Sequence, residues 1–316
     1  MTGPPPACGP QRPGAAGRPG EVGAPVRGGV IRDRGPVQFH AEILAVRKEG
    51  AYFALTLSAP LIPERFRAGH FAAVAVGAAD SSMLLRRAFS IYRVSREGAH
   101  GGTLELIIGP HGRGTQWLVR QPRGTVLDLI APLGRPFTLP RDPAATVLVG
   151  GGYGAAPLFG LAQRLAERGC RVDIVLGAGT TDTLFGVLQA RRIASSLTIT
   201  TEDGSTGTRG RVTDVLPDLL DRTDADVVYS CGPMPMLRAV TDLAVARGAH
   251  SQTAVEEAMA CGVGVCMTCV LPVVGNDGLT RMTRSCTTGP VFDGSRVRWD
   301  DVGTVPEDTH GAAVPT

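Results

Sequence analysis

The sequence predicts a multidomain protein: an antiparallel β-barrel, then a doubly wound α/β domain, then a small C-terminal domain built around cysteines. Three observations lead to this. Residues 36–140 contain short strand-like segments without long helices, residues 141–250 alternate strands with helices, and residues 251–302 carry a tight group of cysteines. With 316 residues and 43% hydrophobic content, the chain is long enough for two or three hydrophobic cores.

The two ends of the chain are expected to be disordered. Residues 1–35 are rich in Pro, Gly and Arg and lack the apolar core of a signal peptide, and residues 303–316 are similar in character. No apolar run approaches the roughly 18 residues that a membrane helix needs. A net charge of +3 with 29 acidic residues gives no sign of a nucleic-acid surface. A cytoplasmic location is therefore expected.

The first folded region reads as a barrel. Its segments are rich in β-branched and alternating apolar residues and are bounded by Gly, Pro or Asp, which is typical of short antiparallel strands. They cover residues 38–49, 51–59, 70–77, 86–94, 102–109 and 124–132. One short helix is expected at residues 115–121, after a pair of glycines.

The second region alternates strands and helices, which predicts a parallel sheet with helices on both faces. The expected strands are residues 146–152, 171–178, 196–204 and 226–233, and the expected helices are residues 156–169, 181–192, 212–222 and 235–248. Ligands of such sheets bind beyond the carboxyl ends of the strands.

Four late cysteines have the spacing of metal ligands. Cys261, Cys266 and Cys269 form C-x4-C-x2-C, and Cys286 follows 16 residues later. This spacing is typical of a plant-type 2Fe–2S cluster, in which four thiolates hold two irons. A structural zinc site is the alternative, but zinc ribbons favour paired C-x2-C knuckles and this chain has one such pair. A region of some 50 residues also needs such a staple to be stable.

A glycine-rich turn follows the first strand of the α/β region. Gly152 and Gly154 belong to the run GGGYG, and Pro157 stands where a third glycine is usual, in what would be the first turn of a helix, where proline is tolerated. At such a strand-to-helix turn, backbone amides and the helix N-terminus face a pyrophosphate, so we expect a dinucleotide here. A plain tight turn is the alternative.

Two further strand ends complete the expected nicotinamide site. The fourth strand ends with Cys231, Gly232 and Pro233, which offer a shallow floor for a flat ring, and we expect Cys231 to lie beside the nicotinamide. Glu202 and Asp203 end the third strand, where an acid accepts hydrogen bonds from a ribose and repels a 2′-phosphate. These acids favour NADH over NADPH, although ordinary exposed turn acids would look the same.

In the barrel region, Arg86 and Arg87 precede Ala88, Phe89 and Ser90. Two arginines on one strand could neutralise a diphosphate. A second turn rich in backbone amides follows, and it consists of Gly112, Arg113, Gly114 and Thr115.

Taken in order, these motifs resemble the ferredoxin–NADP reductase superfamily. They are R-x-F-S, G-x-G-T, G-x-G-x-x-P and C-G-P, followed by E-x-x-M-x-C-G-x-G-x-C-x-x-C from Glu256 and by C-x-x-G-P-V-F from Cys286. The last two resemble the electron-transfer subunits of class 1B dihydroorotate dehydrogenases, over about residues 38–300. Ala88 stands where that branch commonly has proline.

The resemblance implies three cofactors. Arg87, Ala88, Phe89, Ser90, Gly112, Gly114 and Thr115 would bind FAD, the glycine turn and C-G-P would bind NAD(H), and the four cysteines would bind the cluster. NADH gives up two electrons together and a 2Fe–2S cluster accepts one, so a flavin belongs between them. The six histidines suggest no catalytic pairing.

The resemblance also implies a partner. A (β/α)8 barrel that oxidises dihydroorotate needs roughly 250 residues, and this chain has none to spare. We expect an FMN-containing catalytic subunit in a heterotetramer of two plus two, serving pyrimidine biosynthesis. Alternatives are a related reductase that serves a hydrogenase, a ferredoxin or an oxygenase, a redox-sensing protein that only binds the cofactors, and an oxidoreductase stapled by zinc.

Overall fold

The computed structural model describes residues 35–78, 81–97 and 100–312. The segment 1–35 that the sequence predicts to be disordered therefore lies, apart from Gly35, outside the described residues. Within them, every helix is too short or too polar to span a lipid bilayer.

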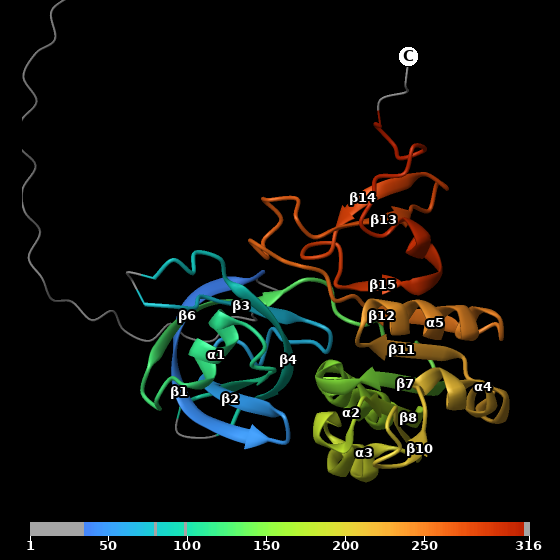
Figure 1. The fold of residues 1–316 in the computed structure, drawn as a ribbon, viewed down its shortest axis with the longest axis horizontal. Helices are drawn as coiled ribbons and strands as arrows, with labels where there is room; N and C mark the ends of the chain where they lie inside the picture. Colours follow the sequence, from blue (N-terminus) through green and yellow to red (C-terminus); the bar gives the residue numbers. More distant parts are fainter. Residues whose placement is uncertain (1–34, 79–80, 98–99, 313–316) are drawn as a thin grey trace, which may run out of the picture. The chain divides into compact units, whose positions relative to one another are not determined.

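The first region is a closed antiparallel barrel, as predicted. Within the described chain it has six strands in the order β1 (Val37–Glu49), β2 (Tyr52–Ser58), β5 (Thr103–Ile108), β4 (Arg87–Ser95), β3 (Phe71–Val74) and β6 (Val126–Leu133), which Figure 1 labels. Inward-facing residues such as Ile43, Leu55, Leu106 and Leu129 are fully buried and form its core. The short helix α1 (Arg113–Val119) follows β5.

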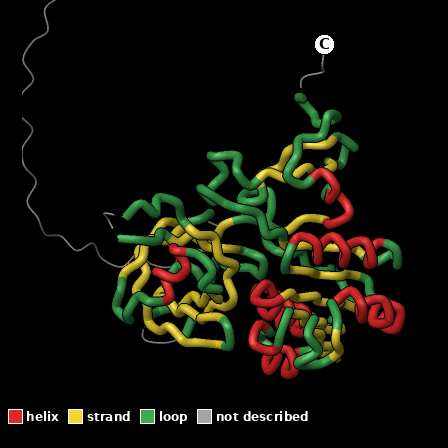
Figure 2. Tube along the Cα trace, viewed as in Figure 1, coloured by secondary structure: helices red, strands yellow, loops and turns green. Residues whose placement is uncertain are grey.

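The second region is a doubly wound sheet. Its strands run in the order β10 (Thr208–Arg209), β9 (Ser196–Thr201), β8 (Arg171–Ala178), β7 (Ala145–Gly151), β11 (Val227–Cys231), β12 (His250–Ala254) and β15 (Val291–Asp293). Helices α2 (Ala156–Glu167) and α3 (Val187–Ile193) pack into the core on one face. Helices α4 (Val212–Thr223) and α5 (Met234–Val245) share the core on the other. Figure 2 shows these long helices gathered around the sheet.

The expected helix at 181–192 is broken in two. A 3-10 turn, η2 (Thr181–Thr183), comes first, and α3 begins only at Val187. Gly186 separates them with a φ of 75°, a left-handed conformation that interrupts a helix. A Cβ on Gly186 would lie 2.1 Å from the ring of Phe159, so the break also admits that ring into the core.

The sheet does not end at residue 250, where the sequence suggested a domain boundary. β12 pairs in parallel with β11, and β15 pairs antiparallel with β12. The signal for β12 is hidden because its sequence, HSQTA, is polar although it is largely buried. Its hydroxyls are satisfied internally, since Ser251 Oγ lies 3.0 Å from Thr241 Oγ1 and Ser230 Oγ donates to Thr253 Oγ1 at 3.1 Å.

The C-terminal region carries a hairpin of β13 (Val270–Val274) and β14 (Thr280–Arg284), then the short turns η3 (Gly294–Arg296) and η4 (Trp299–Asp301). Residues 303–312, expected to be disordered, instead return to this hairpin. Thr309 bridges to Thr280, and the His310 N–H donates to the Thr280 carbonyl at 2.8 Å. An ion pair between Arg298 and Asp308 helps to fix them, a long-range contact that composition does not reveal.

Besides their own cores, the barrel and the sheet contribute residues to one common buried cluster. Tyr52 and Tyr92 of the barrel pack with Phe159 of α2, and the Tyr52 hydroxyl donates to the Thr183 carbonyl at 2.9 Å. This junction fixes the two cavities described next.

Candidate functional site: two adjoining cavities and four cysteines

The first cavity, of about 410 Å³, lies where the barrel meets the sheet. It brings together the barrel residues that the sequence singled out with the C-G-P turn of β11. Its lining includes Arg87, Ala88, Phe89, Ser90, Gly112, Gly114, Thr115, Gly154, Cys231 and Gly232. Segments far apart in sequence thus form one wall, as the resemblance implied.

Arg87 and Gly114 face each other in this wall. A Cβ on Gly114 would lie 2.9 Å from Arg87 Nε, so the missing side chain leaves room for the guanidinium. Arg87 also donates to the Leu85 carbonyl at 2.7 Å, which holds the side chain in place. The other N–H groups of the guanidinium could donate hydrogen bonds to the diphosphate of a flavin dinucleotide, so this wall fits FAD.

Arg86, in contrast, is not available for a diphosphate. It forms an ion pair with Asp128 on β6, at 2.5 Å, and donates to the Asp128 carbonyl as well. Thr115 has a local role too, because its hydroxyl accepts from the Gly112 N–H at 3.0 Å and donates to the Gly112 carbonyl at 3.0 Å at the start of α1. Of the two arginines on this strand, Arg87 is the one that lines the cavity.

The glycine turn and the C-G-P turn touch back to back. A Cβ on Gly154 would lie 2.8 Å from Gly232 Cα, so only glycine permits this approach. Pro157 stands in the first turn of α2, as predicted. The contact puts the expected pyrophosphate turn beside the expected nicotinamide floor.

The second cavity, of about 630 Å³, lies over the carboxyl ends of β7, β8 and β9. It is lined by Gly152, Gly154, Glu202 and Pro233 from the predicted set, and also by Thr200 and Arg211. The Thr200 hydroxyl is fully buried and has no hydrogen-bond partner among the described residues. A buried hydroxyl without a partner is costly, and a bound dinucleotide would satisfy it.

Glu202 and Asp203 differ in what they face. Glu202 lines the second cavity and pairs with Arg211, Oε1 to Nε, at 3.7 Å. Asp203 is not in the lining, and its Oδ1 accepts from the N–H and the hydroxyl of Ser205 at 2.9 and 2.6 Å. Asp203 therefore shapes the turn, and Glu202 is the acid placed to contact a ligand.

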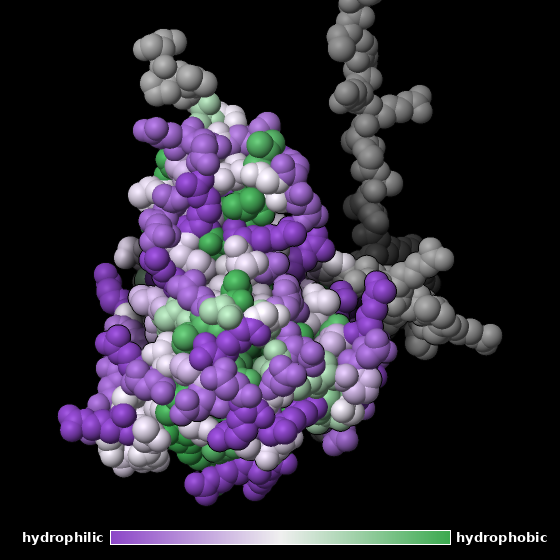
Figure 3. Space-filling model, turned by 90° about the vertical axis from the view of Figure 1, so that its right-hand side faces the viewer, coloured by the Kyte–Doolittle hydropathy of each residue, from purple (hydrophilic) through white to green (hydrophobic). Residues whose placement is uncertain are grey.

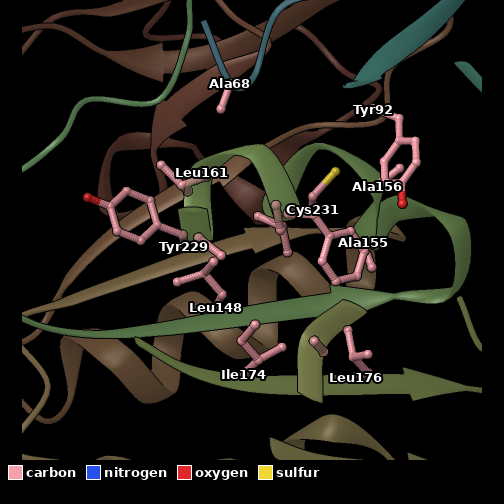
Figure 4. Packing of buried hydrophobic residues seen from close by; sticks show 14 of the residues in the cluster. Ala68, Tyr92, Leu148, Ala155, Ala156, Leu161, Ile174, Leu176, Tyr229 and Cys231 are labelled. Carbon is pink, nitrogen blue, oxygen red and sulfur yellow. The ribbon is translucent and has the colours of Figure 1, made fainter. Parts of the chain in front are cut away.

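Cys231 lies at the inner end of the first cavity. Figure 4 shows it among buried residues of the sheet and of α2, including Leu148 and Ala156. Burial raises the pKa of the Cys231 thiol to about 12, and the Glu256 carboxylate adds to the effect. The thiol therefore stays protonated at neutral pH and offers an uncharged surface.

The four late cysteines come together as two pairs. Cys261 lies beside Cys266, and Cys269 packs with Cys286 in one buried cluster. In the described part of the chain, no three His, Cys, Asp or Glu side chains meet around one point. Two pairs suit two irons with two thiolates each, whereas a single zinc needs four ligands around one centre.

The outer pair, Cys261 and Cys266, and the inner pair, Cys269 and Cys286, differ in their surroundings. Burial alone would raise the pKa of Cys261, but N–H donors of Val263, Cys266 and Val265 bring it down to about 6. At the inner pair, burial raises the pKa of Cys286 to about 12. The buried Ser285 hydroxyl, directly before Cys286, has no partner among the described residues. An acceptor supplied by a cluster would satisfy it.

The cysteines and the first cavity share a wall. Phe71 and Met259 line that cavity, and both also pack with Cys269 and Cys286. Gly262 lies against the barrel beside Phe71, because a Cβ on Gly262 would be 3.6 Å from Cε2 of the Phe71 ring. A group in the cavity and a group on the cysteines are thus separated by one layer of side chains.

Several lining residues were not predicted to be part of a site. Tyr153, His111 and Glu256 line both cavities. The Tyr153 hydroxyl lies 3.1 Å from Glu256 Oε1, and its ring lies 6.0 Å from that of His111. His111 is an exposed residue that lines both cavities, and no motif in the sequence placed it at a site. Tyr153 inside the glycine run was the one available signal, since every other residue of that run is glycine.

Comparisons with known proteins agree with this arrangement. Residues 256–298 match the family model described as the iron-sulfur cluster binding domain of dihydroorotate dehydrogenase B, and residues 148–242 match an oxidoreductase NAD-binding domain. The dihydroorotate dehydrogenase B (NAD(+)) electron transfer subunit of Bacillus caldolyticus is 38% identical, over 78% of this chain and 92% of that protein. The corresponding subunit of Desulforamulus reducens is 33% identical, over 83% and 98%.

Solved structures show the same architecture. A structure of an NADH-dependent reduced ferredoxin-NADP oxidoreductase matches with a TM-score of 0.70 and 28% identity, over 82% of this chain and 90% of that one. A ferredoxin NADP+ reductase from Neisseria gonorrhoeae with bound FAD and NADP shares the fold, with a TM-score of 0.55 and 17% identity over 67% of this chain and 92% of that one. From the curated relatives and the cluster-domain match, this chain belongs to the family of dihydroorotate dehydrogenase B electron transfer subunits.

Proposed function

We propose that this protein relays electrons between NAD(H), FAD and a 2Fe–2S cluster, and exchanges them with a catalytic subunit that converts dihydroorotate to orotate. The observation that carries the proposal is the shared wall of Phe71 and Met259 between the first cavity and the inner cysteine pair. Bound there, a flavin would supply the exchange between two-electron and one-electron transfer.

The residues divide the work between binding sites. Arg87, Ala88, Phe89, Ser90, Gly112, Gly114 and Thr115 hold FAD, and Gly152, Gly154, Pro157, Glu202, Cys231, Gly232 and Pro233 hold NAD(H). Asp203 supports the turn beside Glu202. Cys261, Cys266, Cys269 and Cys286 hold the cluster. Neutral Cys231 gives the nicotinamide a surface without charge, and the protein's contribution is to position the groups and set their potentials.

The partner is a catalytic subunit, since the relatives are named as one subunit of a larger enzyme. We propose that it carries FMN, that the assembly is two plus two, and that it docks over the outer cysteines. Val265 and Met267 on that loop are 79% and 51% exposed. On the face drawn in Figure 3, apolar residues form separate patches among hydrophilic ones. A cytoplasmic location, where thiols stay reduced, completes the proposal.

The domain limits are part of the proposal. The barrel spans residues 36–140, the dinucleotide-binding domain starts at 141, and the cluster-binding segment is inserted between β12 and β15 of its sheet. A related reductase that serves a hydrogenase, a ferredoxin or an oxygenase is the second candidate, because solved structures with this architecture include the ferredoxin reductase in carbazole 1,9a-dioxygenase, with a TM-score of 0.57.

The test is the cofactor content and electron flow of the anaerobically purified chain. We expect FAD, iron and acid-labile sulfide, with NADH bleaching the flavin first. Cys266→Ser should lose iron and sulfide while NADH still reduces the flavin, and Cys170→Ala, which changes a buried thiol outside the site, should keep all three. Flavin without iron or sulfide, even after reconstitution, would contradict the relay. Coexpression with a dihydroorotate-oxidising subunit then tests the partner.

A further inference from the structure

The two cavities meet at a small set of residues that face into both. His111, Tyr153, Gly154 and Glu256 line the first cavity and the second. The expected nicotinamide floor, Cys231, lies in the first cavity only, whereas Glu202 and Arg211 lie in the second only. A dinucleotide held at both ends must therefore cross the boundary that these shared residues form.

Tyr153 is held across this boundary by polar and aromatic contacts. Its hydroxyl donates to Glu256 Oε1 at 3.1 Å, which joins the glycine turn after β7 to the segment after β12. Its ring packs edge-on against Tyr52 at 5.3 Å and near His111 at 6.0 Å. Burial, followed by the charge of Glu256, raises the pKa of Tyr153, so the phenol remains a donor at neutral pH.

Tyr153 is flanked by two glycines, the residues whose backbone dihedrals are least restricted. Gly152 precedes it with a φ of 54° and Gly154 follows it, so neither neighbour has a side chain to lock the turn. Glu256 is an exposed residue, and its carboxylate can be hydrated once the hydrogen bond opens. The contact across the boundary is therefore one that a ligand can displace.

We propose that the Tyr153–Glu256 hydrogen bond is a gate between the two cavities, which must open for the nicotinamide end of the dinucleotide to reach the first cavity. The inference rests on the proposed function, because it assumes that NAD(H) binds in the second cavity. The adenosine and pyrophosphate portions bind without opening it. Because binding then includes the cost of opening, the closed gate weakens the apparent affinity for the complete dinucleotide.

Comparing two ligands distinguishes an effect on the gate from an effect on the rest of the dinucleotide site. NAD+ carries the nicotinamide riboside, and ADP-ribose lacks the nicotinamide ring but keeps the adenosine and pyrophosphate. Titration calorimetry of both ligands with the oxidised, cofactor-loaded protein gives their dissociation constants. Tyr153→Phe removes the hydroxyl and keeps the ring. We expect it to bind NAD+ about tenfold more tightly, the value of one hydrogen bond to a charged group, with ADP-ribose changed less than twofold.

Two further variants control the result. Glu256→Gln keeps an oxygen that can accept from the phenol without its charge, so its gain for NAD+ should be smaller than that of Tyr153→Phe. Tyr229→Phe removes another phenol, a fully buried one, which donates to the Thr138 carbonyl at 2.9 Å and lines neither cavity. It should leave both dissociation constants unchanged.

The outcomes distinguish the gate from the proposed function. A Tyr153→Phe variant that changes both ligands equally, changes neither, or weakens NAD+ overturns the gate. A folded protein that binds neither ligand overturns the proposed dinucleotide site instead. Thermal unfolding of each variant shows whether it is folded.

Discussion

The hydroxyl of Thr268 donates a hydrogen bond to the sulfur of Cys266 across 3.2 Å, on the exposed side of the cysteine loop. Hydrogen bonds to a cluster thiolate stabilise the reduced, more negative state and raise the reduction potential. Thr268→Val keeps the shape of the side chain and removes the donor. We expect the cluster potential to fall by roughly 50 mV, since about 1 kcal/mol is lost in a one-electron couple.

Redox titration followed by electron paramagnetic resonance measures this change directly. Thr268→Ser retains a hydroxyl and should stay close to the original protein. An unchanged potential in Thr268→Val, with a full complement of iron and sulfide, would mean that water replaces the hydroxyl at the sulfur.

The contact between Arg87 and Gly114 predicts that substitution of either residue weakens the binding of FAD. Arg87→Gln removes one of the two arginines that line the first cavity, the other being Arg113, and should weaken FAD binding about tenfold or more. Gly114→Ala places a methyl group 2.9 Å from Arg87 Nε and should have a similar effect without changing any charge. Flavin fluorescence during dialysis measures both. Arg120→Gln, at the end of the same helix, is the control, and a loss as large as that of Arg87→Gln would argue against a specific role for Arg87.

The contrast between Glu202 and Asp203 predicts the choice of dinucleotide. Glu202→Gln removes a charge that repels a 2′-phosphate and releases Arg211 from its 3.7 Å pair. We expect the ratio of kcat/KM for NADPH over NADH to rise about fivefold, which corresponds to about 1 kcal/mol between charges at this range. The double variant Glu202→Gln/Arg211→Gln should lose much of that gain.

Asp203→Asn is the matched control for this experiment. Its carboxylate accepts from Ser205 and does not line the second cavity, so the ratio should stay nearly constant. A shift as large as that of Glu202→Gln would place the wrong acid at the ligand.

The sequence was sufficient for features with a local signal. Alternation over a few residues predicted the barrel strands, which the structure confirms. The spacing from Cys261 to Cys286 predicts the metal ligands. β12 escaped because its buried polar residues, such as Ser251, are satisfied by partners distant in sequence. Arg86 was misleading for the same reason, since Asp128 lies 42 positions away.

The boundary between the cavities was also beyond local reasoning. Tyr153 and Glu256 are separated by 103 positions and meet only because β7 and β12 flank β11 in one sheet. Such pairs depend on strand order, which a single sequence leaves open. Motif spacing predicts the groups that bind cofactors, whereas the strand order determines which of these groups lie side by side.

The Arg86–Asp128 pair predicts a pH-dependent contribution to stability. Burial alone raises the pKa of Asp128, but hydrogen bonds from Arg86 and Gln38 outweigh it and hold the pKa below its ordinary value of 3.8. The folded state therefore favours the carboxylate. Its contribution is fully present above the unfolded pKa and is lost as the pH falls through the lower folded pKa.

Asp128→Asn should accordingly lower the free energy of unfolding by about 1 kcal/mol at pH 7, after discounting for partial exposure. The difference from the original protein should shrink as the pH falls below about 3.8 and on through the lower folded pKa, because the carboxyl becomes protonated first in the unfolded and then in the folded state. Urea unfolding at a series of pH values measures it, with Asp142→Asn, an exposed carboxylate, as the control. A difference that stays constant down to the lowest pH would show that the hydrogen bonds to Arg86, rather than the charge of Asp128, stabilise the barrel at this point.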